Sequence, residues 1–157
     1  MRSILNFEEY LEKGIVKKQR PDVSRANFLI EEANKSFLGL KQRIEKIGIN
    51  ELNASSVVKD SHDIILELIR AKMLLEGFNA SGIGAHESEV AYMSELGFSK
   101  AEIEFMNEVR FLRNGVLYYG TKLDKEYAEK VIEFTKNNYQ RLKKIVEERL
   151  KWNSPTQ

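Results

Sequence analysis

The stretch ASSVVKDSHDIILELIRAKMLLE, residues 54–76, decides the fold of this chain. Two apolar stripes run along it at helical spacing. The first consists of Val57, Ser61, Ile64, Leu68, Ala71 and Leu75, and the second of Val58, Ile65 and Ile69. A helix with two apolar faces needs packing partners on both sides, so the sequence predicts the central helix of a bundle.

A second long helix is predicted before this stretch, from Ser24 until Gly48 ends it. Its apolar residues keep heptad spacing: Ala26, Ile30, Ala33, Phe37, Leu40, Ile44 and Ile47. The same spacing also suits one strand of a coiled coil. Alanine at two seam positions favours a helix inside a bundle.

The sequence FMNEVRFLRNGVLYYG, residues 105–120, predicts a third helix, and Ser99 with Glu102 forms a capping box at its start. Its apolar stripe consists of Phe105, Val109, Leu112, Val116 and Tyr119. A fourth long helix is expected to restart at residues 121–124 and to continue to about Lys151.

The remaining segments are shorter. We expect a short helix at 7–13, a solvated linker at 17–21, a loop at 77–84 and a short helix at 86–96. Nowhere does an alternation of period two, bounded by hairpin turns, predict a strand. The predicted fold class is all-α, an antiparallel bundle of four main helices with one or two additional short helices.

A chain of 157 residues with 42% hydrophobic content fits one domain with a sizeable core. We expect a short N-terminal helix and linker at 1–23, the helical bundle at 24–151 and a disordered tail at 152–157.

The charges and the cysteine content narrow the classes of function. Acidic and basic residues are intermixed to a net charge of +1, so no overall field attracts nucleic acid or a membrane surface. The absence of cysteine excludes disulfides and thiolate chemistry. No signal peptide and no membrane span is predicted, and we expect a soluble, cytoplasmic protein with no cofactor.

A polar stripe on the third helix carries the best candidate site. Arg110, Arg113, Asn114 and Tyr118 follow one another at helical steps and share a face. An arginine fork, an amide and a phenol together suit the binding of a nucleotide or of RNA phosphate. The alternative is that Arg113 pairs inside the bundle with an acidic residue of the central helix.

That acidic residue would come from a polar stripe on the central helix, which holds Asp60, Asp63, Glu67 and Arg70. Asp63 and Glu67 are the candidate supporting residues, because a half-buried carboxylate needs a cation or solvent. An ordinary solvated face is an equally good interpretation. The two histidines, His62 and His86, lie on different segments without metal-ligand spacing, and no metal site is predicted.

The chain resembles the HEPN superfamily (higher eukaryotes and prokaryotes nucleotide-binding). The resemblance lies in an Arg-Asn pair late in the penultimate helix, followed by Val-Leu-Tyr-Tyr-Gly and a long final helix, and in a central helix ending Leu-Ile-Arg-Ala-Lys-Met-Leu-Leu-Glu-Gly. It covers roughly residues 24–150. It implies a helical bundle that commonly forms a homodimer, with two arginine motifs meeting in a cleft.

Many members of the family are metal-independent ribonucleases of toxin-antitoxin or defence systems, often beside a small nucleotidyltransferase. Their motif is an arginine, usually a polar residue after it, and a histidine shortly afterwards. Arg113 and Asn114 match its first part, whereas the positions for the histidine hold Tyr118, Tyr119 and Gly120. A phenol with a pKa of about 10 is a poor general base near neutrality. His62 or His86 could supply a base only if the fold brings one of them near Arg113.

Two hypotheses follow from the sequence. The first is a HEPN-like nucleotide- or RNA-associated protein, a degenerate or weak ribonuclease, whose site holds Arg113, Asn114 and Tyr118. The second is a non-catalytic interaction module that binds a partner protein such as a nucleotidyltransferase. The missing histidine favours binding over cleavage.

Overall fold

A computed structural model describes residues 1, 3–119 and 123–152, with the backbone alone for 116–119. The elements follow one another as α1 (Phe7–Glu12), β1 (Val16–Lys18), α2 (Val23–Ile47), α3 (Ala54–Leu75), β2 (Phe78–Ala80), α4 (Ala85–Ala91), the 3₁₀ helix η1 (Tyr92–Leu96), α5 (Lys100–Tyr119) and α6 (Lys125–Trp152). The all-α fold class is therefore confirmed.

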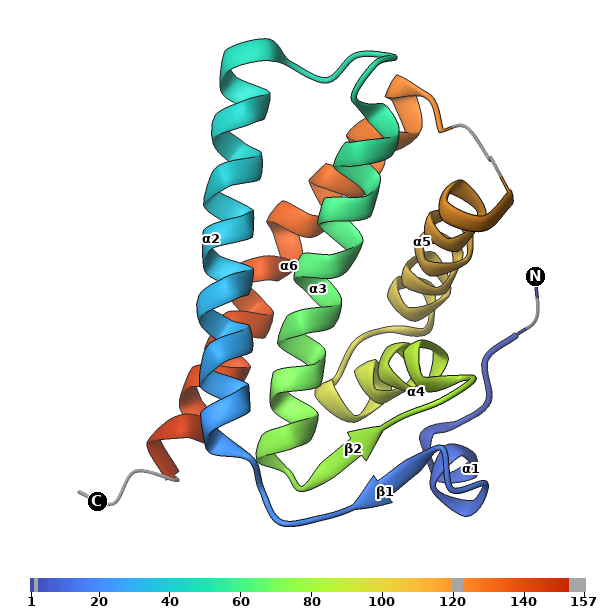
Figure 1. Ribbon diagram of the computed structural model, residues 1–157, viewed down its shortest axis with the longest axis vertical. Coiled ribbons are helices and arrows are strands. Elements are labelled where there is room, and N and C mark those ends of the chain that lie inside the picture. The colour runs from blue at the N-terminus through green and yellow to red at the C-terminus, as the bar shows by residue number, and fades with distance from the viewer. Residues whose placement is uncertain (2, 120–122, 153–157) are drawn as a thin grey trace.

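Helix α3 is the centre of the bundle. It packs against α2 and α6 on one side and against α4 and α5 on the other, as Figure 1 shows. Both of its predicted stripes are buried, including the polar Ser61 of the first stripe, and the neighbouring His62 is buried as well. The two apolar faces thus have the partners that their pattern requires.

The helix ends follow local sequence signals. Gly48, with a positive φ of 70°, ends α2. At the start of α5 the backbone N–H of Ser99 donates to Glu102 Oε2 at 2.7 Å, and that of Glu102 donates to Ser99 Oγ at 3.2 Å, which confirms the capping box. At the start of α6, Asp124 Oδ1 accepts from the N–H of Tyr127 at 2.8 Å.

The last helix is predicted to restart within residues 121–124. The contacts of Asp124 place the start at the end of this range, and Lys125 is the first helical residue. Thr121 and Lys122 lie outside the described residues. So does the predicted disordered tail, except for Trp152, which is the last residue of α6.

The prediction of no strand is wrong. Val16–Lys18 and Phe78–Ala80 form a two-stranded antiparallel sheet in which Val16 pairs with Ala80 and Lys18 with Phe78. Strands of three residues are too short to show an alternation of period two, and they arise because the chain brings the two segments together. The sheet sets the position of the segment that leads into α4 (Figure 1).

The N-terminal residues join the same core. Phe7 and Tyr10 of α1 are buried, and the ring of Phe7 lies against those of Phe78 and Tyr92 with centroids 5.3 and 4.8 Å away. Within the described part of the chain, no helix is both long enough and apolar enough to cross a membrane.

Two glycines should respond in opposite directions to alanine. Gly77 has φ of +81°, and a Cβ there would lie 2.6 Å from the backbone oxygen of Gln19. Gly39 lies inside α2 with no atom within 4 Å of an added Cβ. We expect Gly77→Ala to lower the free energy of unfolding by about 1–3 kcal/mol, and Gly39→Ala to raise it by about 0.5–1 kcal/mol. Urea denaturation of the two variants measures both, and equal shifts would contradict this account.

Candidate functional site

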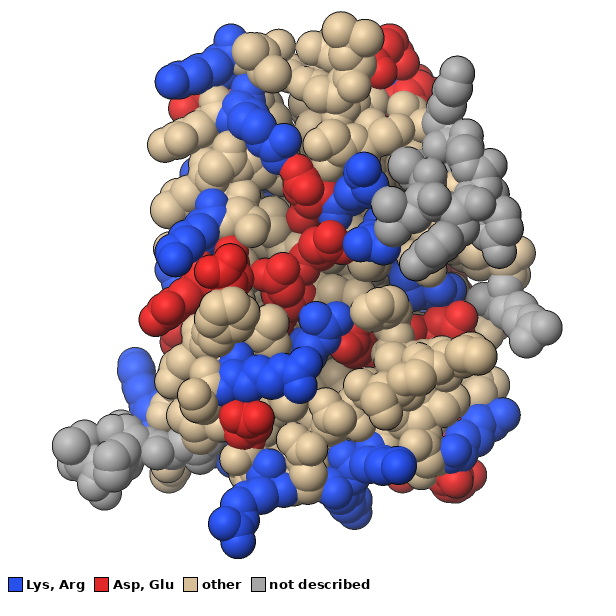
Figure 2. Space-filling model, viewed as in Figure 1, with Lys and Arg blue, Asp and Glu red and all other residues tan. Residues whose placement is uncertain are grey.

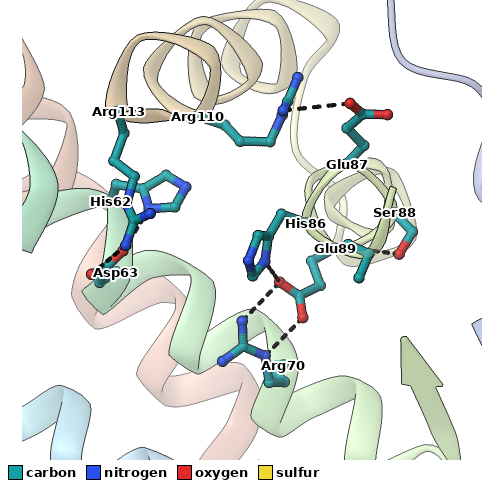
Figure 3. A network of polar contacts seen from close by, with 10 residues as sticks. His62, Asp63, Arg70, His86, Glu87, Ser88, Glu89, Arg110 and Arg113 are labelled. Atoms are coloured by element: carbon teal, nitrogen blue, oxygen red, sulfur yellow. Dashed lines mark hydrogen bonds and ion pairs between the residues drawn. The ribbon is translucent and has the colours of Figure 1, made fainter. Parts of the chain in front are cut away.

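A small pocket of about 190 Å³ opens where α3, α4 and α5 meet. It is lined by His62, Asp63, Leu66, Glu67, Arg70, His86 and Arg113. Both histidines of the chain are therefore at one site, together with two arginines and two carboxyl groups. Figure 3 shows five of these side chains on the three helices: His62, Asp63, Arg70, His86 and Arg113.

Asp63 connects a histidine to the predicted arginine. Its Oδ1 lies 2.7 Å from His62 Nδ1, and its Oδ2 accepts from Arg113 Nη2 at 3.2 Å. Burial alone would raise the pKa of Asp63, but the contacts with His62 and Arg113 outweigh it and hold the pKa below its usual value. The carboxylate is therefore ionised and accepts both bonds.

His62 is held as a neutral base. Its side chain is only 3% exposed, and burial lowers its pKa despite the hydrogen bond and the charge of Asp63, which raise it. Because an ionised carboxylate can only accept, the proton lies on Nδ1 and the lone pair on Nε2. The Asp63–His62 pair thus fixes both the tautomer and the ring orientation.

Three buried polar atoms of the pocket have no hydrogen-bond partner within the described part of the chain: His62 Nε2, Arg113 Nε and Glu67 Oε2. A buried polar atom without a partner costs free energy, so such atoms are uncommon in folded proteins. One acceptor, one donor and one carboxyl oxygen left open around the same pocket suit a small polar ligand.

Glu67 adds a second group that titrates near neutrality. Burial, followed by the nearby charge of Asp63, raises its pKa to about 7, while Arg70 acts in the opposite direction. Near pH 7 the carboxyl is therefore present in both protonation states. The pocket combines a neutral histidine base with a carboxyl group able to donate a proton.

Glu89 of α4 contacts two of the residues that line the pocket, Arg70 and His86. Its side chain is 3% exposed and accepts from Arg70 Nε at 2.7 Å and Arg70 Nη2 at 3.0 Å, while His86 Nδ1 lies 3.1 Å from its Oε2. This two-point contact ties α4 to α3. The side chain of His86, which also lines the pocket, remains about half exposed.

The residues predicted for the site separate in the structure. Arg113 lines the pocket and pairs with Asp63, which is the pairing that the sequence offered as the alternative. Arg110 points instead toward α4, where Nη1 lies 3.5 Å from Glu87 Oε1 (Figure 3). It also donates twice to Asn107 Oδ1. Arg110 is therefore a buried structural residue in this conformation.

Glu67, Asn114 and Tyr118 are the other residues predicted for the site. Glu67 lines the pocket, as a supporting residue should. Asn114 is partly exposed and is not among the described residues that line it. The side chain of Tyr118 lies outside the described residues.

Sequence reasoning left Arg70 and Glu89 out of the site, and it left open whether His62 or His86 lies near Arg113. A signal existed for Arg70, because it lies on the same helical stripe as Asp63 and Glu67. No local pattern marks His86 or Glu89, whose place depends on how α4 docks on α3. No group of three histidine, aspartate or glutamate side chains within the described ranges is arranged to hold a metal ion.

A larger groove of about 470 Å³ adjoins the pocket and runs between α2 and α3. Asp63 and Glu67 line both the pocket and the groove. The rest of the groove is lined by Ser36, Gly39, Leu40, Arg43, Asp60 and Ile64. Arg43 donates to Asp60 across it. In Figure 2, acidic and basic side chains interleave over the middle of this face.

A larger cavity, of about 830 Å³, lies elsewhere, between the N-terminal segment and the first half of α5. Among the described residues that line it are Phe98, Ile103 and Phe105, with Lys100, Glu104 and Glu108 but no histidine or arginine. Of these two cavities, the smaller pocket is the one whose described lining residues include histidine and arginine.

Comparisons of the chain with protein-family models, with curated proteins and with solved structures find no match. The resemblance to the HEPN superfamily therefore stays a prediction from the sequence motifs.

Glu67→Gln should make the protein more stable at high pH. The carboxyl has a pKa of about 7 in the folded protein and an ordinary value of 4.5. The folded state therefore binds the proton more tightly, and stability falls as the pH rises from about 4.5 to about 7. We expect the variant to melt at the same temperature as the natural protein at pH 4 and at a higher one at pH 8. The matched change Glu133→Gln, on the exposed face of α6, should give no such trend.

Proposed function

We propose that this chain is a HEPN-like protein that binds the phosphate of RNA or a nucleotide in the pocket and cleaves RNA weakly there. The observation that carries the proposal is His62. Its Nε2 is a neutral, buried and unpartnered base beside Arg113, and it supplies from α3 the group that the sequence lacks after Arg113.

Each group in the pocket then has a role. Arg113 donates to a non-bridging phosphate oxygen through its open Nε. The 2′-hydroxyl of the ribose gives its proton to His62 Nε2 while its oxygen attacks the phosphorus. The bond from phosphorus to the 5′-oxygen breaks, and that oxygen takes a proton from the Glu67 carboxyl. The products are a 2′,3′-cyclic phosphate and a 5′-hydroxyl.

The same contacts limit the affinity. Arg113 is already paired with Asp63, and Arg70 is engaged by Glu89. An incoming phosphate must compete with Asp63 for Arg113, and the net charge of +1 gives little attraction at long range. We therefore expect weak binding that depends on low salt.

The homodimer, the nucleotidyltransferase partner and a toxin-antitoxin role are further implications of the resemblance, and they stay predictions. Sedimentation of the purified protein tests the homodimer directly.

Two substitutions should separate binding from cleavage. Arg113→Ala should weaken binding of a short fluorescent RNA roughly 10–100-fold, because a charge-assisted hydrogen bond to phosphate is lost. His62→Asn keeps an N–H donor near Asp63 but removes the base, so binding should persist while cleavage falls about 10²–10⁴-fold. Fluorescence anisotropy at low salt measures the first quantity and gel analysis of the products the second.

Lys100→Ala is the matched control, since this lysine lies on the same helix and is 91% exposed. It should change neither quantity. If the natural protein binds neither RNA nor nucleotide at low salt, the proposal is wrong. A partner protein that co-purifies equally with the Arg113→Ala variant would then favour the interaction module.

A further inference from the structure

The positive charge of the chain is concentrated in one segment near its N-terminus. Residues 13–25 hold five lysine and arginine residues against a single acidic residue, Asp22. The whole chain has a net charge of only +1, so the remainder of it is net acidic. A local excess of positive charge attracts anions even where the overall charge of the protein does not.

Three of these basic residues are exposed, as the predicted solvated linker should be, yet their backbone is held in place. Lys17 and Lys18 lie on β1, which pairs with β2. Beside the exposed Arg20, the backbone N–H of Gln19 donates to the oxygen of Gly77 at 2.8 Å. The basic segment, defined as Lys17, Lys18 and Arg20, thus presents its charges from a fixed backbone.

The charges of the basic segment are not neutralised within the described part of the chain. None of its three side chains forms an ion pair or a hydrogen bond with another described residue. Two acidic residues near the segment are already engaged: Asp22 accepts from the backbone N–H of Arg25 at 3.0 Å, and Glu76 pairs with Lys72 and Arg149, each at 2.6 Å. The basic segment can therefore bind an external anion.

The basic segment lies at the end of the helix that carries the pocket. Arg70 lines the pocket, and Leu74, one turn further along α3, accepts from the backbone N–H of Asp22 at 3.0 Å. At 1.5 Å per residue, Arg70 and Leu74 are about 6 Å apart along the helix axis. In Figure 2, Lys and Arg side chains predominate along the lower edge of the molecule, where Figure 1 draws β1. A chain of phosphates can run from the pocket past Arg70 to this edge.

We propose that the basic segment binds the phosphate backbone of a single-stranded RNA whose reacting phosphate lies in the pocket. The inference rests on the proposed function and narrows its substrate to an oligonucleotide. Lys17 and Lys18 extend from opposite faces of β1. Within the described ranges β1 has a neighbouring strand on one edge only, so both side chains can reach an RNA backbone that runs along its other edge.

Contacts of this kind recognise charge rather than base sequence. Residues 13–25 hold no aromatic side chain on which a base could stack. Lysine binds phosphate as a point charge, and phosphate contacts carry no direct sequence information. Oligouridine and oligocytidine of equal length should therefore bind within about twofold of each other.

Fluorescence anisotropy at low salt tests this RNA path with two labelled 2′-O-methyl oligouridines, which cannot be cleaved because the attacking hydroxyl is blocked. One has about 12 nucleotides and the other about three. We expect the longer strand to bind at least about tenfold more tightly. The triple variant Lys17→Gln, Lys18→Gln, Arg20→Gln should weaken binding of the longer strand about 10–100-fold and that of the shorter strand by less than about twofold.

The salt dependence of binding provides a second measurement. For single strands, the logarithm of the affinity falls with the logarithm of the salt concentration by roughly 0.7 for each phosphate contact. Loss of three contacts should therefore make this slope shallower by about two for the longer strand.

The matched control is the triple variant Lys130→Gln, Lys136→Gln, Lys144→Gln, which removes three exposed lysines from α6. It has the same net charge as the first variant, so it separates the position of the charges from their number. It should keep the preference for the longer strand and the steep salt dependence. The melting temperature of each variant shows whether it is folded.

The outcomes separate the two proposals. Equal binding of the two strands, with Arg113→Ala still weakening both, overturns the RNA path and leaves the proposed function standing. An equal loss of affinity in the α6 variant also overturns the path, because net charge alone would then explain the effect. Failure of both strands to bind at low salt overturns the proposed function and the path with it.

An anionic membrane is the other surface that exposed lysines can contact. Sedimentation with vesicles of phosphatidylserine and phosphatidylcholine tests it. If the vesicles retain the protein through the same three residues while strand length has no effect on RNA binding, the basic segment is a membrane contact and the RNA path is wrong.

Discussion

The burial of α3 on two sides is the constraint from which the rest of the structure follows. Its apolar stripes draw α2 and α6 against one side and α4 and α5 against the other. The same helix carries Asp63, Glu67 and Arg70 on its third face, where they are neither fully solvated nor fully enclosed. Charged groups in such a position need partners. The neighbouring helices supply Arg113 and Glu89.

These pairings order the side chains of the pocket, but they leave some of its buried polar atoms without a hydrogen-bond partner among the described residues. The Arg70–Glu89 contact ties α4 to α3, and the Asp63–Arg113 contact ties α5 to it. Glu67 has no comparable partner for its buried oxygen among the described residues, and burial together with the charge of Asp63 raises its pKa. Buried polar atoms that lack a hydrogen-bond partner, within a network of paired residues, mark a place where a ligand can supply the missing hydrogen bonds.

Sequence reasoning succeeded where the signal is local. The capping box at Ser99, the stop at Gly48 and the periodic burial of α3 depend on residues within a few positions of one another. It missed the β1–β2 pair because the register of three-residue strands comes from contacts between segments some 60 positions apart. It grouped Arg110 with Arg113 because both lie on one stripe, whereas α4 engages Arg110 separately.

By itself, the sequence determined the class of fold, the long helices with most of their ends, and the choice of Arg113 with Asp63 or Glu67 as possible partners. Only the tertiary structure decided that Asp63 is the partner and that His62 and His86 lie beside it. Periodicity shows which face of a helix is buried. It does not show which helix covers that face or at what height. The bond between Arg113 and Asp63 joins residues 50 positions apart, so it depends on how α5 docks on α3.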